Sequence, residues 1–217
     1  MRSYCTITSA KRTLEKLYLA EWGLFITPDA LERNRPSFLW SREQSPPMPF
    51  AIDNGAWGAF TQGRRWEEGP FLGLLHRLGA EADFAVVPDI VEGGVKSLEL
   101  SLEWLPEVRR SSRRALIPVQ DGMDTGMLEQ HLCEHVGVFV GGSTEFKEAT
   151  LRDWARLAKR HGAWCHVGRV NSVRRVNMCT TAGVDSVDGT SVCRFSRNLA
   201  KLNAAGRQLP LLEVLDG

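Results

Sequence analysis

Three aspartates stand where short apolar runs of this sequence end: Asp53, Asp89 and Asp188. If they share a pocket, their mutual repulsion separates their pKa values, so that one stays ionised while another keeps its proton. An ionised carboxylate can attack a carbon and a protonated one can supply a proton, which is how two carboxylates cleave a glycosidic bond. Each aspartate could instead cap a helix or shape a turn. Their recurrence at successive run ends favours a shared site.

Other groups that could bind a ligand follow further runs. Gln120 offers a hydrogen-bond donor and an acceptor, which suits the edge of a nucleobase or an amide. The pair Gly141-Gly142 lets the backbone approach a flat ligand closely. His166 and Arg169 end the next run and add an imidazole and a guanidinium group.

The elements that must position these residues repeat along the chain. Eight short apolar runs predict buried parallel strands, and helical apolar spacing separates them. The runs cover residues 4–8, 23–27, 50–53, 83–87, 115–119, 136–140, 163–167 and 184–187. They start about 26 residues apart, which fits a series of βα units. We therefore expect an α/β fold, a single compact (β/α)8 barrel of the TIM type over residues 1–217, whose strand ends meet at one rim.

Two further features complete this expectation. An open doubly wound sheet is the alternative architecture, but no GxGxxG motif follows the first run. The stretch 34–49 contains four of the ten prolines, and we interpret it as a surface excursion.

Composition excludes several classes of protein. Hydrophobic residues make up 43% of the 217 residues and charged residues 24%, as in a chain that buries a core. We see no apolar stretch long enough to cross a membrane and no secretion signal, so we expect a cytoplasmic protein. The five cysteines form no CxxC pair and are expected to be reduced thiols. The five histidines lack a ligand pattern, so no metal and no cofactor is expected.

The ordered set of motifs resembles the tRNA-guanine transglycosylases. These motifs are Asp-Asn-Gly-Ala at 53–56, Pro-Asp at 88–89, Val-Gln-Asp-Gly at 119–122, Val-Gly-Gly at 140–142, His-Val-Gly-Arg at 166–169 and Gly-Val-Asp-Ser-Val-Asp-Gly-Thr at 183–190. The set is still more similar to shorter relatives, encoded in phages and bacterial islands, that insert deazaguanines into DNA. The resemblance implies a glycosyltransferase that exchanges guanine in nucleic acid for a 7-deazaguanine such as preQ0 or preQ1, through a covalent aspartyl intermediate.

The resemblance also implies residue roles. Asp188 would attack C1′ of the nucleotide, and Asp53 would move protons on the two bases. Asp185 is the alternative nucleophile, but in a strand it points away from the side of Asp188. The remaining substrate-binding positions would hold the base and its ribose: Asp89 and Gln120 on the base edge, the amides of Gly141 and Gly142 on its carbonyl oxygen, Arg169 near the ribose or a phosphate, and Asn54, His166 and Gly168 around them.

Departures from the family pattern affect the expected substrate. The tRNA-specific members carry a zinc subdomain after the barrel, and here no such subdomain is expected. Asn54-Gly55-Ala56 replaces the family's serine and double glycine. Both departures favour DNA over tRNA, with a base flipped from its stack, and leave room for a partner protein or a homodimer.

Arginine usage and two aromatic residues bear on the same partner. The chain has 21 arginines and 6 lysines, which reflects either phosphate recognition or a GC-rich genome. The candidate phosphate contacts on the rim are Arg64, Arg65, Arg174, Arg175, Arg194 and Arg197. Trp57 and Phe60 could stack on a base or simply cover the barrel mouth. Two other functions stay open: a glycosidase that uses the same carboxylates with water, and a non-catalytic barrel that binds nucleic acid.

Overall fold

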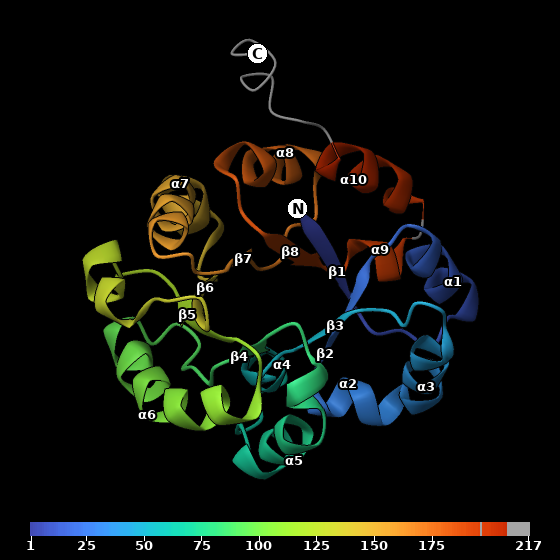
Figure 1. Cartoon of the computed structure of the whole chain (residues 1–217), viewed down its shortest axis with the longest axis horizontal. Coiled ribbons are helices and arrows are strands. Elements are labelled where there is room, and N and C mark those ends of the chain that lie inside the picture. The colour runs from blue at the N-terminus through green and yellow to red at the C-terminus, as the bar shows by residue number, and fades with distance from the viewer. Residues whose placement is uncertain (196, 208–217) are drawn as a thin grey trace.

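Eight parallel strands close into a barrel in the computed structural model, which describes residues 1–195 and 197–207. Each strand pairs with the next in sequence, and β8 pairs with β1 through Tyr4 opposite Asp188. Helices surround the strands in a ring (Figure 1). The predicted (β/α)8 architecture is confirmed.

All eight predicted strands are present, each within a few residues of the expected position. They are β1 (Arg2–Thr6), β2 (Gly23–Ile26), β3 (Phe50–Ile52), β4 (Ala85–Val86), β5 (Ala115–Val119), β6 (Val136–Val140), β7 (Cys165–Val167) and β8 (Ser186–Gly189). Most strand residues are buried, since helices cover the outside and side chains fill the inside.

The helices are mainly short crossovers. They are α1 (Lys11–Leu19), α2 (Pro28–Arg33), α3 (Arg35–Glu43), α4 (Ala56–Thr61), α5 (Glu68–Leu78), α6 (Val95–Ser111), α7 (Thr144–Arg160), α8 (Val173–Ala182), α9 (Ser191–Arg194) and α10 (Asn198–Gly206). Three 3-10 helices, η1 (Gly79–Glu81), η2 (Thr125–Met127) and η3 (Glu129–His131), complete the described elements.

The stretch 34–49 is not the irregular excursion that its prolines suggested. Pro36 lies in the first turn of α3, where a helix needs no N–H from it. Phe38 of that helix is buried against Phe50, with ring centroids 5.3 Å apart. The other three prolines follow the helix, so burial of Phe38 decides the local structure.

The crossover between β5 and β6 also departs from a regular βα unit. It contains only η2 and η3, not an α-helix. Gly122 has a positive φ of 86° just after β5, and the Asp124 side chain accepts a hydrogen bond from the Met127 N–H. These turn-forming residues leave no run long enough for a helix.

Strand residues alternate between two separate apolar clusters. An inner cluster fills the barrel and consists of Tyr4, Phe25, Ala51, Phe84, Val86 and Leu116, with Phe139 and Trp164 packed against it. Their sequence neighbours, such as Cys5, Leu24 and Val187, belong to the cluster between strands and helices. Because the side chains of a strand alternate, Asp188 lies on the inner side and Val187 on the outer side, as the sequence predicted.

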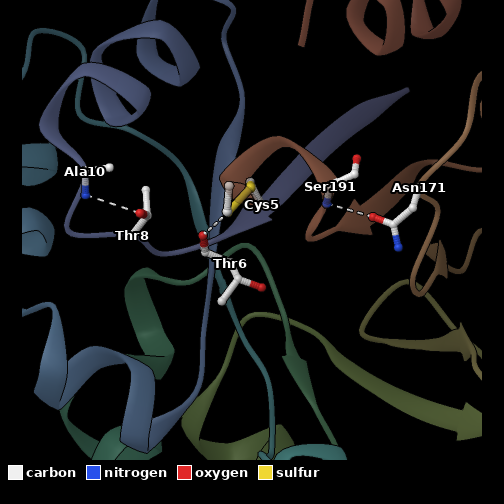
Figure 2. Close-up of a disulfide and its surroundings, with 7 residues drawn as sticks. Cys5, Thr6, Thr8, Ala10, Asn171 and Ser191 are labelled. Carbon is white, nitrogen blue, oxygen red and sulfur yellow. Dashed lines mark hydrogen bonds between the residues drawn. A yellow bond between two sulfur atoms is a disulfide. The ribbon is translucent and has the colours of Figure 1, made fainter. Parts of the chain in front are cut away.

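The expectation that all cysteines are reduced thiols is wrong for one pair. Cys5 and Cys193 form a disulfide between β1 and α9, with Cα atoms 6.8 Å apart (Figure 2). This proximity could not be predicted from the sequence, because the two cysteines are 188 positions apart and are brought together only when closure of the barrel places the segment after β8 on β1. Cys133, Cys165 and Cys179 are free.

Two kinds of feature are absent from the described residues. Over residues 1–195 and 197–207, no helix has the length and apolar character needed to cross a membrane. The same part of the chain holds no group of three or more His, Cys, Asp or Glu side chains placed to bind a metal ion.

The backbone of β6 passes close to Trp164, the residue before β7, and this contact gives a stability prediction. A Cβ at Gly137 would lie 2.2 Å from the Trp164 carbonyl oxygen, so Gly137→Ala must displace backbone. We expect this variant to lose about 1–3 kcal/mol or more in the free energy of unfolding, measured with urea. In the matched control, Gly73→Ala in α5, a Cβ meets nothing within 4 Å, and we expect a gain of about 0.5–1 kcal/mol. Equal stability of the two variants would contradict the packing described.

Candidate active site

The three predicted carboxylates meet at the carboxyl-terminal rim of the barrel. Asp53 follows β3, Asp89 follows β4, and Asp188 lies near the end of β8. The charges of Asp188 and Asp89 both act on Asp53, so Asp53 lies within electrostatic range of the other two. Asp188 is buried, with 7% of its surface exposed.

Burial changes the protonation of two of these groups. Loss of hydration raises the pKa of Asp53 to about 7; the Gly55 N–H opposes this shift, and the charges of Asp188 and Asp89 add to it. Burial likewise raises the pKa of Asp89 to about 6, against a hydrogen bond from Asn54. Because the pKa of Asp53 lies close to neutral pH, Asp53 can both release and take up a proton there.

A chain of hydrogen bonds from inside the barrel ends on Asp188. His166 Nε2 lies 3.0 Å from Asp188 Oδ1, and His166 Nδ1 lies 2.8 Å from Ser186 Oγ. Since a carboxylate only accepts, His166 Nε2 carries the hydrogen and Nδ1 accepts from the Ser186 hydroxyl. The Ser186 oxygen in turn accepts from Trp164 Nε1 at 2.8 Å. Every donor in this chain points towards Asp188.

His166 is therefore not the substrate-binding residue that the sequence suggested. Its side chain is fully buried beneath Asp188. The rings of Phe139, Phe25 and Phe84 surround it, with centroids 5.0, 5.6 and 5.0 Å away. No substrate can touch the imidazole there, and its role is to orient Asp188.

Asn54 also supports a carboxylate and does not face a ligand. Its Nδ2 donates to Asp89 Oδ1 at 2.9 Å and to the Val87 carbonyl at 2.8 Å. Its Oδ1 accepts from the Ala56 N–H. All its hydrogen-bonding groups are occupied, and only 3% of its surface is exposed. Asn54 thus holds Asp89 in place, in contrast to the predicted contact with substrate.

Gln120 was predicted to offer a donor and an acceptor to a ligand, and only the acceptor is available. Its Nε2 donates to the Ile90 carbonyl at 2.9 Å and to Ser97 Oγ at 2.8 Å. Among the described residues no group donates to its Oε1, and that atom is not a buried orphan. The side chain therefore offers an acceptor, but no donor, to a ligand.

The two glycines of the pair differ in whether their N–H groups are available to a ligand. The Gly141 N–H donates to the Val119 carbonyl in the barrel, so it cannot also bind a base as predicted. The Gly142 N–H has no acceptor among the described residues. Gly142 has a φ of 71°, and a Cβ there would lie 2.6 Å from Asp121 Oδ2, so glycine is required.

Arg169 and Gly168 lie where the sequence placed them, at the end of β7. Arg169 has a positive φ of 59°, and its backbone N–H donates to Asp188 Oδ1 at 3.3 Å. Its guanidinium donates to the Gly142 carbonyl and stacks 4.2 Å from the Trp57 ring centroid. Gly168 packs against Phe139, since a Cβ there would lie 2.7 Å from that ring. Arg169 thus spans from the β7 end to the helix after β3.

Sequence reasoning missed Lys147, which is buried close to this end of β7. Its Nζ donates to the Gly168 carbonyl at 2.9 Å. Burial, with a contribution from the charge of Arg169, lowers the pKa of Lys147 to about 8. A signal was present, because Lys147 precedes Leu151 by four residues and Trp154 by seven, on the apolar stripe of α7.

The predicted phosphate-binding arginines differ in their availability. Arg174 and Arg175 both bind Glu148, and Arg64 pairs with Asp29 at 2.6 Å. Arg65 is exposed and Arg197 lies 5.6 Å from the Phe195 ring centroid. The side chain of Arg194 is outside the described residues. Only some of the six arginine side chains are therefore exposed to solvent without forming an ion pair with a carboxylate of the protein.

Comparison with known proteins bears on the fold. No protein-family model and no curated protein sequence matches the chain. Among solved structures, 3-hexulose-6-phosphate synthase from Salmonella typhimurium is similar, with 14% identity and a TM-score of 0.54, over 95% of this chain and 98% of that chain. A Mycobacterium tuberculosis protein matches over 96% of this chain and 94% of its own, with 13% identity and a TM-score of 0.49. The likeness to the synthase agrees with the barrel fold and bears on the fold alone.

Ser186 offers a test of the hydrogen-bond chain beneath Asp188. Ser186→Ala leaves both Trp164 Nε1–H and His166 Nδ1 without a partner in the barrel interior. We expect a loss of about 1–3 kcal/mol in the free energy of unfolding. Ser41→Ala is the control, since buried Ser41 makes only one bond, to the Phe38 carbonyl of its own helix. A smaller loss at Ser186 than at Ser41 would argue against the chain.

The raised pKa of Asp53 predicts a pH dependence of stability. Between about pH 4 and pH 7 the folded protein keeps a proton that the unfolded chain has released, so the stability of the native protein falls as pH rises. Asp53→Asn removes this dependence. The free energy of unfolding of the variant, relative to that of the native protein, should therefore rise by up to about 4 kcal/mol from pH 4 to pH 8. Urea unfolding at both pH values measures the difference. Exposed Asp153→Asn should show a pH-independent effect, and the same flat result for Asp53→Asn would refute the assignment.

Proposed function

We propose that the protein exchanges a guanine base of nucleic acid for a 7-deazaguanine, through a covalent intermediate on Asp188. The observation that carries this proposal is the division of the acid cluster. Asp188 receives hydrogen bonds from His166 and from the Arg169 N–H, which orient its carboxyl group, while burial raises the pKa of Asp53 to about 7, so that Asp53 can release and take up a proton near neutral pH. This pair suits the roles of nucleophile and acid, the two groups that displacement at a glycosidic carbon requires.

The proposed reaction has two balanced steps. An oxygen of Asp188 forms a bond to C1′ as the bond from C1′ to N9 of guanine breaks, and the departing base takes the electron pair together with a proton from Asp53. The arriving base then gives its N9 proton to Asp53 while N9 attacks C1′ and releases Asp188. Asp53 is protonated again at the end, so no other reactant is consumed.

The groups around the cluster complement the edge of a guanine. The base presents N–H donors at N1 and N2 and an acceptor at O6. Asp89 and Gln120 Oε1 offer acceptors, and the Gly142 N–H offers a donor. Asn54 orients Asp89 by donating to Oδ1, so Oδ2 is left for the base. This set would accept a 7-deazaguanine equally well, because it makes no demand on position 7.

The fold is consistent with an enzyme of this kind. In TIM barrels, active sites lie at the carboxyl-terminal rim, where the acid cluster is found. The proposed target is a single nucleotide flipped from its stack, because the buried acid cluster cannot reach a base that is still stacked in a helix.

The test is base exchange on an oligonucleotide that contains one guanine. The protein, the DNA and a 7-deazaguanine are incubated, and the nucleosides are analysed by mass spectrometry. We expect incorporation by the native protein and a loss of at least about 1,000-fold for Asp188→Asn, because the covalent step is removed. A denaturing gel should show the protein–DNA adduct for the native protein alone.

Asp185→Asn is the matched control from the same strand. Asp185 Oδ2 accepts from the Cys165 N–H at the opposite end of β8, so this variant should retain exchange. Loss of exchange in Asp185→Asn with retention in Asp188→Asn would overturn the assignment of the nucleophile. Release of free guanine and an abasic site without any deazaguanine would identify a glycosidase instead. Absence of both products would leave a barrel that only binds.

A further inference from the structure

Exposed apolar side chains gather at the rim that holds the acid cluster. Of the nine large apolar side chains exposed in the described residues, six follow carboxyl ends of strands: Trp57, Phe60, Ile90, Val95, Val173 and Phe195. Trp57 and Phe60 of α4 are 43% and 48% exposed, and their ring centroids lie 6.0 Å apart at an interplanar angle of 32°. Water-exposed neighbouring rings beside a site are unusual unless something covers them.

Cationic groups accompany these rings. The Arg169 guanidinium lies 4.2 Å from the Trp57 ring centroid, and Arg197 lies 5.6 Å from that of Phe195. An arginine beside an aromatic ring is a favourable place for a nucleobase, because both groups stack on its face and the cation attracts the neighbouring phosphate.

A cleft lies on the other side of α4. Gly58, Ala59 and Gln62 line it from the helix, and Gly55 connects it to the loop of Asp53. Its charged lining residues are Arg33, Arg64, Arg65, Asp29 and Glu67. Positive charge exceeds negative charge by one, and the single ion pair within it, Arg64 with Asp29, is about half exposed and open to competition by an anion.

From these three observations we infer that α4 binds an unpaired segment of the nucleic-acid substrate. The bases next to the target nucleotide stack on Trp57 and Phe60, and the phosphates of the segment pair with Arg64 and Arg65 in the cleft. This inference rests on the proposed function, and it adds that the substrate is bound with its bases unstacked from a partner strand. A paired duplex hides the faces of its bases, so it cannot use the two rings.

The experiment measures binding without turnover, in the full chain carrying Asp188→Asn. The probe is a fluorescein-labelled single-stranded DNA of about 20 nucleotides, mostly thymine with one central guanine, followed by anisotropy over a range of salt concentrations. Trp57→Ala and Phe60→Ala should each weaken binding about tenfold at every salt concentration without changing the salt dependence. Arg65→Gln should instead reduce the slope of log K against log salt by about 0.7, the value for one phosphate contact on a single strand.

Matched controls come from other surfaces of the barrel. Leu39→Ala removes a side chain of α3 that is 52% exposed, and Arg113→Gln removes an exposed charge just before β5, at the opposite end. Neither should change affinity or slope. Equal losses in the controls, or native affinity in Trp57→Ala and Phe60→Ala, would overturn the inference. Failure of the Asp188→Asn protein without further changes to bind the single strand would also overturn the inference. So would equally tight binding of the corresponding duplex.

Two further measurements distinguish DNA from RNA as the ligand, and failure of this inference from failure of the proposed reaction. An RNA strand of the same sequence shows whether the rim distinguishes the two sugars, since tighter binding of RNA would make RNA the source of the segment. Exchange by the native protein on the same DNA strand is measured in parallel. Exchange with no effect of Trp57→Ala would refute the role of α4 alone. Binding that depends on Trp57 without any exchange would refute the proposed reaction alone.

Discussion

Burial of several carboxylates at one barrel rim is the constraint on which the site depends. Pairing of β8 with β1 closes the barrel and sets Asp188 within reach of the loops after β3 and β4. Removing these groups from water costs free energy, which the protein limits by raising the pKa values of Asp53 and Asp89, so that both stay protonated to higher pH than usual, and by directing donors at Asp188. The chemistry proposed for the site depends on this difference between Asp188 and the other two carboxyl groups.

The fold could be predicted because strand periodicity and burial act locally. The eight apolar runs indicated eight strands, and the position of Asp53, Asp89 and Asp188 after such runs placed them on one rim. The region of α3 was mispredicted because Phe38 packs on Phe50, a tertiary contact that outweighs a high proline content. The disulfide of Cys5 and Cys193 likewise depends on closure between the two ends of the chain.

Residue roles were harder to predict than residue positions. Asn54 and His166 lie beside the predicted carboxylates, yet both hold a carboxylate in place and neither is open to a ligand. Sequence gives the order of groups along a strand but not which hydrogen bonds each has already made. Gly141 illustrates the point, since its N–H belongs to the barrel ladder while that of Gly142 is left for the site.

The aromatic filling of the barrel has a consequence for the order of events. Tyr4, Phe25, Phe84 and Phe139 close the interior around His166, so the acid cluster opens in one direction only. In the proposed exchange, the departing base and the base that replaces it would therefore pass through the same opening, one after the other, while the sugar stays bound to Asp188. Between the exit of one base and the entry of the next, the proposed ester of Asp188 would have to be shielded from water that enters by that opening.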